Sequence, residues 1–258
     1  MKNFCILFIT FQISILSFSQ NHQILVEYEA IKGNITNKEI LIATEEQALY
    51  VTDSLLIENK NNANITEIDE YNNKITISQK VIKLDVTKYY IKRKSNIIYF
   101  TQVFKDKPSL VKDSLPNYEW DLKSIETKKI GDFLCRKAVT NFRGSKMTAW
   151  YTEELSVPFG PWKFKDLPGL ILELYNTNDS SIHHWIAKKI IFPYNKEIQY
   201  IYNNNLPIFK FESIVKDMEA QIKEQMKRLR SRVPQGVSVS KTKLNRTGVE
   251  KKYEWEEN

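Results

Sequence analysis

Apolar residues tend to alternate with polar ones over most of the chain, from Ile24 to about Ile191. In the run from Leu25 to Ala30, for example, Val26, Tyr28 and Ala30 would share one face. A period of two is that of a β-strand with one buried face, and these runs are rich in the Ile, Val, Tyr and Phe that strands favour. This part of the chain therefore predicts antiparallel strands rather than helices.

One hairpin is especially clear, over residues 132–152. Its first arm is predicted at Phe133–Thr140, its loop at Asn141–Ser145 and its second arm at Lys146–Thr152. Gly144 supplies the positive φ that such a loop usually needs.

A single helix is predicted near the C-terminus, over residues 211–231. Pro207 precedes it, and Pro234-Gln235-Gly236 ends it. We expect its apolar face to lie on the sheet, because its apolar residues recur at helical spacing. These residues are Phe211, Ile214, Val215, Met218, Ile222, Met226 and Leu229.

These patterns predict a mainly β fold with one C-terminal helix, built as a single domain over residues 20–236. We expect an antiparallel curved sheet or half-barrel covered by the helix, with a β-sandwich as the alternative. The nearest analogy is the lipoprotein-carrier architecture, in which a curved sheet cups a hydrophobic ligand, although shared fold does not establish shared function. Residues 237–258 would form a polar tail, in which Tyr253–Glu256 could add an edge strand.

The first twenty residues predict export. An almost uncharged run from Phe4 to Phe18 follows Lys2, and Ser17 and Ser19 stand where signal peptidase requires small side chains. The run is shorter than the roughly 20 apolar residues of a membrane span. We therefore expect residues 1–19 to be a signal peptide and the mature protein to be periplasmic or extracellular.

Basic residues are concentrated at the C-terminal end of the chain. Residues 222–258 hold ten Lys and Arg against five Glu, and the whole chain has a net charge of +7. In an exported protein this excess favours anionic lipids or acidic partners over nucleic acid. The basic side of the predicted helix is either solvated or a partner surface, which includes peripheral contact with an anionic membrane surface. Its residues are Lys223, Lys227, Arg228 and Arg230.

The sequence contains no pattern typical of a metal or cofactor site, and we predict neither. Cys135 is the only cysteine beyond the signal peptide and lies in a strand-like run, where a small buried apolar role is usual. His183 and His184 are neighbours on a predicted strand, so they would point to opposite faces and could not bind one ion together. Serine-hydrolase and phosphate-binding motifs are missing.

Four carboxylates leave one enzymatic alternative open. Glu153, Glu154, Asp166 and Glu173 could converge with one of the two histidines and form a hydrolase site. Surface charge is the plainer interpretation of these residues, so we name no catalytic residue.

Residues 150–174 are the most distinctive segment. Turns are predicted at Gly160-Pro161 and at Pro168-Gly169, and the second pair suits a type II turn in which the glycine takes a positive φ. Between the turns, Trp162, Phe164 and Leu167 should fill the core as a plug, and a buried strand should follow from Leu170. The residues of this structural motif are Trp150, Gly160, Pro161, Leu167, Pro168, Gly169, Leu170 and Ile171.

This segment resembles the GLPGLI family, a group of exported Bacteroidetes proteins. The matching features lie over residues 130–192 and include the cysteine strand, Ala149-Trp150-Tyr151-Thr152, Gly160-Pro161 and the run from Leu167 to Glu173. Asp166 stands where the family usually has its first glycine. Aspartate tolerates a positive φ better than most residues do, so we expect the turn to survive. The resemblance implies a signal-bearing envelope protein and brings no established activity with it.

We therefore expect a non-enzymatic envelope protein that binds a ligand or partner at the concave face of the sheet or at the basic helix. The partner would be an envelope protein, a lipid or a peptide. A hydrolase with an unrecognised active site is the alternative.

Overall fold

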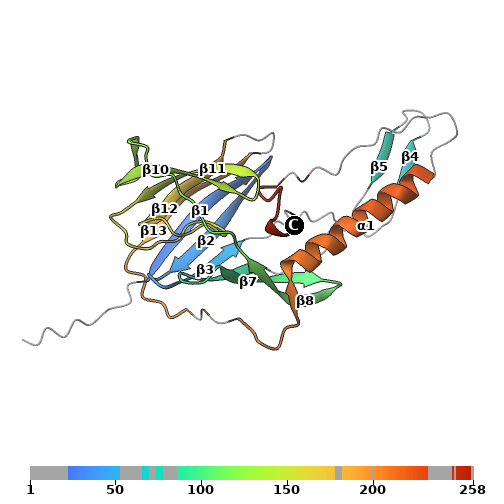
Figure 1. Cartoon of the computed structure of the whole chain (residues 1–258), viewed down its shortest axis with the longest axis horizontal. Helices are drawn as coiled ribbons and strands as arrows, with labels where there is room; N and C mark the ends of the chain where they lie inside the picture. The colour runs from blue at the N-terminus through green and yellow to red at the C-terminus, as the bar shows by residue number, and fades with distance from the viewer. Residues whose placement is uncertain are drawn as a thin grey trace, which may run out of the picture.

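A computed structural model of the chain describes residues 23–52, 66–69, 74–77, 86–177, 182–198, 200, 202–231, 246 and 248–256. The predicted signal peptide, residues 1–19, and residues 232–245 of the C-terminal region lie outside the described residues. What is described is mainly β, with one α-helix, so the predicted fold class is confirmed (Figure 1). None of its helical segments combines the length and the apolarity that a membrane crossing requires.

Twelve strands form one open, curved sheet in the order β14-β8-β7-β6-β3-β2-β1-β13-β12-β11-β10-β9. All neighbouring strands are antiparallel except β14 and β8, which are parallel. A separate pair consists of β4 (Thr66–Asp69) and β5 (Lys74–Ile77). The strands of the sheet are β1 (Ile24–Lys32), β2 (Ile35–Ala43), β3 (Gln47–Thr52), β6 (Thr87–Lys92), β7 (Ile97–Phe104), β8 (Lys107–Ser114), β9 (Thr127–Ile130), β10 (Phe133–Phe142), β11 (Ser145–Thr152), β12 (Leu170–Asn176), β13 (His183–Ile191) and β14 (Ile208–Lys210).

The predicted hairpin is β10–β11, but its loop is shorter than expected. Phe142 pairs with Ser145, so only Arg143 and Gly144 form the turn. Their φ angles are 45° and 84°. Two positive φ values are typical of the type I′ turn that best fits the twist of a hairpin. Gly144 therefore has the predicted positive φ, and the ends of the predicted loop belong to the strands.

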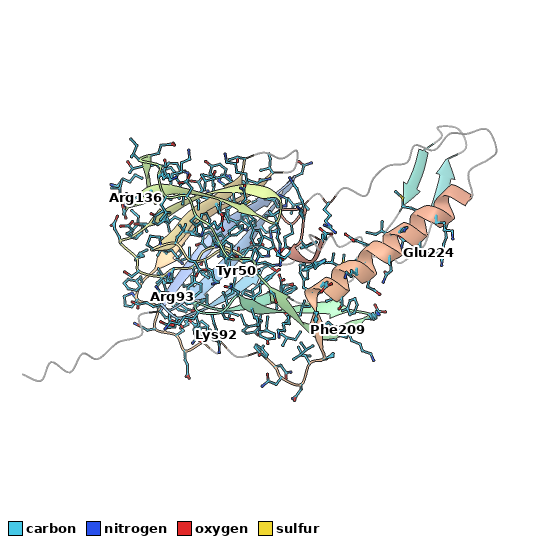
Figure 2. The ribbon with its side chains drawn as sticks, in the orientation of Figure 1. Tyr50, Lys92, Arg93, Arg136, Phe209 and Glu224 are labelled. Atoms are coloured by element: carbon cyan, nitrogen blue, oxygen red, sulfur yellow. The ribbon has the colours of Figure 1, made fainter. Side chains whose placement is uncertain are left out.

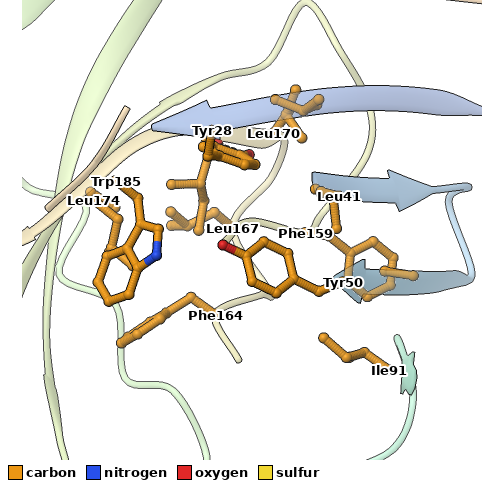
Figure 3. Packing of buried hydrophobic residues seen from close by; sticks show 14 of the residues in the cluster. Tyr28, Leu41, Tyr50, Ile91, Phe159, Phe164, Leu167, Leu170, Leu174 and Trp185 are labelled. Atoms are coloured by element: carbon orange, nitrogen blue, oxygen red, sulfur yellow. Dashed lines mark hydrogen bonds between the residues drawn. The ribbon is translucent and has the colours of Figure 1, made fainter. Parts of the chain in front are cut away.

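The concave face of the sheet holds the core. A row of ring contacts runs across β1, β3, β6 and β7, through Tyr28, Tyr50, Tyr89 and Phe100, with centroids 6.4, 6.3 and 5.0 Å apart from one ring to the next. The segment between β11 and β12 folds into this concave face. Figure 3 shows three of its residues, Phe159, Phe164 and Leu167, packed among strand residues. Tyrosine and phenylalanine rings bury large apolar areas, so this row supplies much of the core.

One carboxylate lies inside this core. Glu39 is fully buried, and its Oε2 accepts hydrogen bonds from the hydroxyl of Tyr50 at 2.5 Å and from Nε1 of Trp185 at 2.8 Å. Figure 3 shows these two donor atoms directed into the same space. Oε1 pairs with Nζ of Lys32 at 2.5 Å. A buried charge is tolerated only with such partners, so Glu39 ties β1, β2, β3 and β13 together.

Between β13 and β14, residues 192–198, 200 and 202–207 are described, and we call them the crossing segment. It runs past the convex face of the sheet, where the ring of Tyr202 contacts those of Tyr90 and Tyr99. Gln23 fastens it, because its backbone carbonyl accepts the N–H of Tyr194 at 2.7 Å and its side chain donates to the carbonyl of Lys196 at 2.8 Å. Tyr200 donates to the Gln23 side chain at 2.5 Å. The segment thus covers part of the face that lies opposite the core.

The α-helix α1 spans Phe211–Ser231, the range that its periodicity predicts. Only its first turns pack on the body of the protein: Ile214 and Val215 are buried, whereas Met218 and Ile222 are exposed. Figure 2 shows Glu224 on a part of the helix that extends away from the sheet. The expectation that the helix lies along the sheet and covers it is therefore wrong.

The last described segment, residues 248–256, packs between the sheet and the start of α1 (Figure 1). Val249 and Tyr253 are buried, so this part of the predicted polar tail belongs to the folded body. Glu254–Glu256 form a short 3-10 helix. The suggested edge strand at Tyr253–Glu256 is therefore wrong. We call residues 248–256 the C-terminal segment.

Candidate functional site

Two glycines of the motif are required for space. A Cβ on Gly160 would lie 2.6 Å from Cδ1 of Ile171, and a Cβ on Gly169 would lie 1.9 Å from the carbonyl oxygen of Thr152. Gly169 does not have a positive φ, so the predicted role for it in a type II turn is wrong. Asp166 does have a positive φ, of 73°, which agrees with the expectation that an aspartate can take this position.

The predicted plug is present, and it carries two buried lysines that the sequence did not predict. Phe164 and Leu167 are buried, and Trp162 is half-buried. The side chains of Lys163 and Lys165 are 2% and 1% exposed. Burying an ammonium group without partners is costly, so both lysines need acidic or carbonyl partners inside the protein.

Lys163 belongs to an ion cluster that consists of Asp113, Arg143, Lys163, Glu250 and Glu254. We call it the buried ion cluster, because all its members except Glu254 are buried or nearly so. Asp113 on β8 accepts two hydrogen bonds from the guanidinium of Arg143, at 2.8 and 3.0 Å, and one from Lys163 at 2.7 Å. Glu250 pairs with Arg143 and, at 2.7 Å, with Lys163. Glu254 completes the set by accepting from Nε of Arg143 at 3.1 Å.

The ionised forms of Asp113 and Arg143 are favoured in this cluster. Burial disfavours the charge of Asp113, but the positive charge of Lys163 and the hydrogen bonds from Arg143 outweigh it, and the pKa of Asp113 lies below its ordinary value. Burial likewise opposes the charge of Arg143, but the hydrogen bonds to Asp113 and the charge of Glu250 raise its pKa.

The same cluster fastens the C-terminal segment to the turn of the β10–β11 hairpin. The carbonyl oxygen of Arg143 accepts the N–H groups of Lys251 and Lys252 at 2.8 and 3.0 Å. The guanidinium carbon of Arg143 also lies 5.2 Å from the ring centroid of Tyr253 and 5.6 Å from that of Phe211. Cations over aromatic faces are attracted to them, so Arg143 joins the sheet, the start of α1 and the C-terminal segment.

A cavity of about 660 Å³ lies beside this cluster. His183 and Trp185 of β13 line it on the side of the sheet, together with Trp162 of the plug. The rings of Trp162 and Trp185 are stacked, with centroids 6.1 Å apart and planes 9° apart. The apolar face of α1 and the C-terminal segment line the opposite side, where Met218 is half-exposed. The wall of the cavity is therefore mostly aromatic and aliphatic.

Each lysine, arginine and glutamate that lines the cavity is paired within the protein. Lys32 is held by buried Glu39, and Glu250 by the buried ion cluster. Arg246 donates to Glu219 of α1 at 2.5 Å, and to Glu256 at 2.6 Å. These charges already have partners, so the cavity is suited to a ligand without net charge.

The histidines lie on opposite faces of β13, as predicted. His183 lines the cavity, whereas Nε2 of His184 lies 2.8 Å from Oε1 of Glu173 on the convex face. Glu173 also pairs with Lys128. Burial acts to raise the pKa of Glu173, but the hydrogen bonds from His184 and Lys128 outweigh this effect, and the pKa lies below its ordinary value. Cys135 is buried near this trio, and burial raises its pKa to about 11, so the thiolate is disfavoured.

The other carboxylates considered for a hydrolase site do not join Glu173. Asp166 pairs with Lys165 at 2.8 Å, and Glu153 pairs with Arg136 at 3.1 Å. Glu154 accepts the backbone N–H of Leu134 at 2.9 Å. Of the groups proposed, the structure therefore brings together only Glu173 and His184. Among the described residues no group of three or more His, Cys, Asp or Glu side chains is arranged to hold a metal ion.

The remaining predicted residues are placed as follows. Trp150 is buried on the convex face, where the ammonium of Lys128 lies 4.4 Å from its ring centroid. Lys223 and Lys227 are exposed on α1, and Arg228 pairs with Glu224 at 3.2 Å. The side chain of Arg230 lies outside the described residues.

Sequence analysis missed Arg143 and Lys163. A weak signal was available for Lys163, because it stands between two aromatic residues of a predicted plug. No signal was available for Arg143, since an arginine beside a turn glycine is ordinarily solvated. Its burial depends on acids more than 25 positions away in the sequence, such as Asp113 and Glu250.

Comparison with known proteins gives one family and one fold. The family model described as "N-glycanase peptide, N-terminal domain" matches residues 50–206, which run from β3 into the crossing segment. Two crystal forms of PNGF-II, in space groups C2 and P21, superpose with a TM-score of 0.52 at 20% identity. They cover 76% of this chain, and this chain spans 32% and 33% of theirs, about a third of their length. None of the curated proteins matches.

Proposed function

The chain belongs to the family described as N-glycanase peptide, N-terminal domain, and from this premise we propose that it is a non-enzymatic module that binds a neutral carbohydrate. The ligand lies in the cavity between the sheet and α1. PNGF-II, one solved structure of similar fold, is about three times as long as the matched part, so the activity of that whole protein is not carried over to this chain. The word glycanase in the family description directs the proposal to a glycan as the ligand class.

The observation that carries the proposal is the internal pairing of the charges around the cavity. A charged ligand would have to compete with these ion pairs, whereas a neutral one would not. Sugar rings present apolar C–H faces together with hydroxyl groups. The indole and aliphatic walls suit the first, and the amide of Gln102 suits the second. The volume of about 660 Å³ is within the range of ordinary small-ligand sites.

Of the histidines and carboxylates considered for a hydrolase site, only His183 lines this cavity. Glu173 and His184 are on the convex face, and the other carboxylates considered are separately paired. This separation supports a binding role over the hydrolase alternative, because catalysis requires its groups to meet at the bound substrate.

We further propose that the protein is exported and acts in the bacterial cell envelope. The apolar N-terminal run and the resemblance of residues 130–192 to the GLPGLI family support this. Membership of that family stays a prediction.

The test is isothermal titration of the full chain with two neutral probes, a mannooligosaccharide and a chitooligosaccharide. Met218→Trp should narrow the cavity and weaken binding at least about tenfold, or 1.4 kcal/mol. Met226→Trp is the matched control, because Met226 lies two turns further along α1 and does not line the cavity. It should change the affinity less than about twofold.

Two results would overturn the proposal. One is the absence of binding by either probe, or equal binding by both variants. The other is the release of shortened sugars during the titration, if the His184→Asn variant no longer releases them. That result would replace the binding role with hydrolysis at the convex face.

A further inference from the structure

A second polar surface lies on the convex face, at the end of the sheet formed by β6, β7, β8 and β14. Tyr90 pairs with Tyr99, Tyr99 with Lys112, and Lys112 with Lys210. Paired residues on neighbouring strands point to the same face, so the four side chains form a row. We call this row, with Lys88 and Tyr202, the outer basic strip. The next residues along β7 and β8, Phe100 and Val111, are buried in the core on the opposite face.

Within the part of the chain that the structure describes, the lysines of the outer basic strip have no acidic partner. Lys112 and Lys210 are directly opposite each other, and like charges in that position destabilise a sheet. Among the described residues, no carboxylate forms an ion pair with either of them or with Lys88. The charges that line the cavity are all paired, whereas the strip's lysines are not. The strip should therefore prefer an anionic ligand, unlike the cavity. An anion placed here would relieve the repulsion.

The tyrosines of the strip present partly exposed rings beside these charges. The ring of Tyr202, in the crossing segment, lies with its centroid 4.6 Å from that of Tyr99 and 5.7 Å from that of Tyr90. A pocket of about 480 Å³ adjoins them, lined in part by Lys88, Tyr90, Thr101 and Asn203. Ring faces, hydroxyl groups and an amide therefore lie within one lysine-bearing surface.

We propose that the outer basic strip binds an anionic polysaccharide, a sugar chain that carries carboxylate or sulfate groups. The acidic groups pair with Lys88, Lys112 and Lys210, and the sugar rings lie against the tyrosines. This site goes beyond the neutral ligand of the cavity, since it is on the other face of the sheet and selects charge. The tyrosine rings and the hydroxyl-bearing pocket favour a sugar over an acidic peptide, which would use the lysines alone.

The experiment measures binding of the full chain to four probes in 150 mM salt: heparin, polygalacturonate, neutral dextran and polyglutamate. We expect binding to at least one of the two acidic sugars and weaker binding to dextran and polyglutamate. Lys112→Gln with Lys210→Gln should weaken it about fivefold to tenfold, since exposed ion pairs contribute up to about 1 kcal/mol each. Tyr202→Ala should weaken it at least about threefold, because a stacking face is removed.

Two matched controls decide whether the site is specific. Lys129→Gln with Lys146→Gln removes the same charge from exposed lysines at the other end of the sheet, and should change the affinity less than about twofold. Met218→Trp, which blocks the cavity, should also leave it unchanged, so that failure here and failure of the neutral-sugar site are distinguishable.

Four outcomes would overturn the inference. Equal losses in the two lysine pairs would show attraction to net charge alone. Equal binding of polyglutamate, unaffected by Tyr202→Ala, would assign the strip to acidic proteins. Loss in Lys223→Gln with Lys227→Gln, but not in the strip, would move the anion site to α1. If neither acidic sugar bound, the proposed anionic-sugar site would be ruled out.

Discussion

Individual residues in this protein are chosen for the space they leave as much as for the contacts they make. Gly169 and Gly160 belong to the most distinctive segment of the sequence, yet neither has a positive φ. Each lets a neighbouring strand approach to a distance that a methyl group would block. The segment between β11 and β12 can therefore enter the concave face only if these two positions lack a side chain.

Gly169→Ala should lower the free energy of unfolding by more than about 3 kcal/mol, because its Cβ would collide with the backbone carbonyl of Thr152. Gly33→Ala is the matched control. Gly33 has a φ of 61° with open space around it, so the alanine should cost only about 1–2 kcal/mol. Urea denaturation of the two variants measures the difference. Equal losses would contradict the steric explanation.

Sequence patterns predicted residues whose role depends on local backbone and missed those whose role depends on distant partners. Gly144 and Asp166 were expected to tolerate a positive φ, and both have one. Glu39 and Lys163 gave no comparable indication. Their burial is possible only because Trp185, Asp113 and others reach them from strands far away in the sequence. Alternation assigns a residue to a face of a strand, but not the partners across that face.

At the scale of elements, α1 shows how far a periodic pattern can be trusted. Its limits agree with the prediction, but its apolar stripe does not lie on the sheet along its length. Ile214 is 1% exposed, whereas Met218 is 50% exposed. Periodicity identifies which side of a helix is apolar. It cannot say where the body of the protein ends beneath the helix, because that depends on the position of β8 and β14.

The helix should accordingly be held by its first turns alone. Ile214→Ala should lower the free energy of unfolding by about 2–4 kcal/mol, the usual cost of truncating a buried aliphatic side chain. Met226→Ala, on the part that extends from the body, should cost less than about 1 kcal/mol. Thermal or urea unfolding of both variants tests this. A loss at Met226 as large as at Ile214 would mean that the far half of the helix is also anchored.

The C-terminal segment illustrates the same limit from the opposite side. Its sequence is polar and predicted an exposed tail. The structure packs it against the hairpin turn because Arg143 provides a buried positive charge for Glu250 and carbonyl contacts for its backbone. The polar sequence predicted that this segment would be exposed, but its contacts with the buried ion cluster place it within the folded body.

The whole molecule should lose stability in acid. The pKa values of Asp113, Glu173 and Glu256 all lie below their ordinary values, and that of Glu256 is about 2. A lowered pKa in the folded state stabilises the fold above the ordinary value, near 4, and this contribution disappears as the pH falls through the folded-state pKa. Urea unfolding at pH 6, 4 and 3 should therefore show a falling free energy of unfolding below about pH 4.

Asp113→Asn separates the contribution of the buried ion cluster from that of the exposed acids. The variant should be less stable than the parent at pH 6, by about 3–5 kcal/mol, because Arg143 and Lys163 lose a buried partner. Its stability should also depend less steeply on pH below 4. An equally steep dependence in both proteins would assign the acid sensitivity to carboxylates outside the cluster.

Within the described residues, the strand order leaves the sheet with two margins, β14 and β9, and a wide sheet with unpaired margins is a template for strand addition and self-association. Both margins are poor templates. β14 has three residues and β9 has four, and each carries lysine, as Lys210 on the first and Lys128 and Lys129 on the second. A polymerising neighbour would find few backbone groups to pair with and would have to bring its own charge beside an existing one. The chain can therefore keep its sheet open without recruiting another copy to close it.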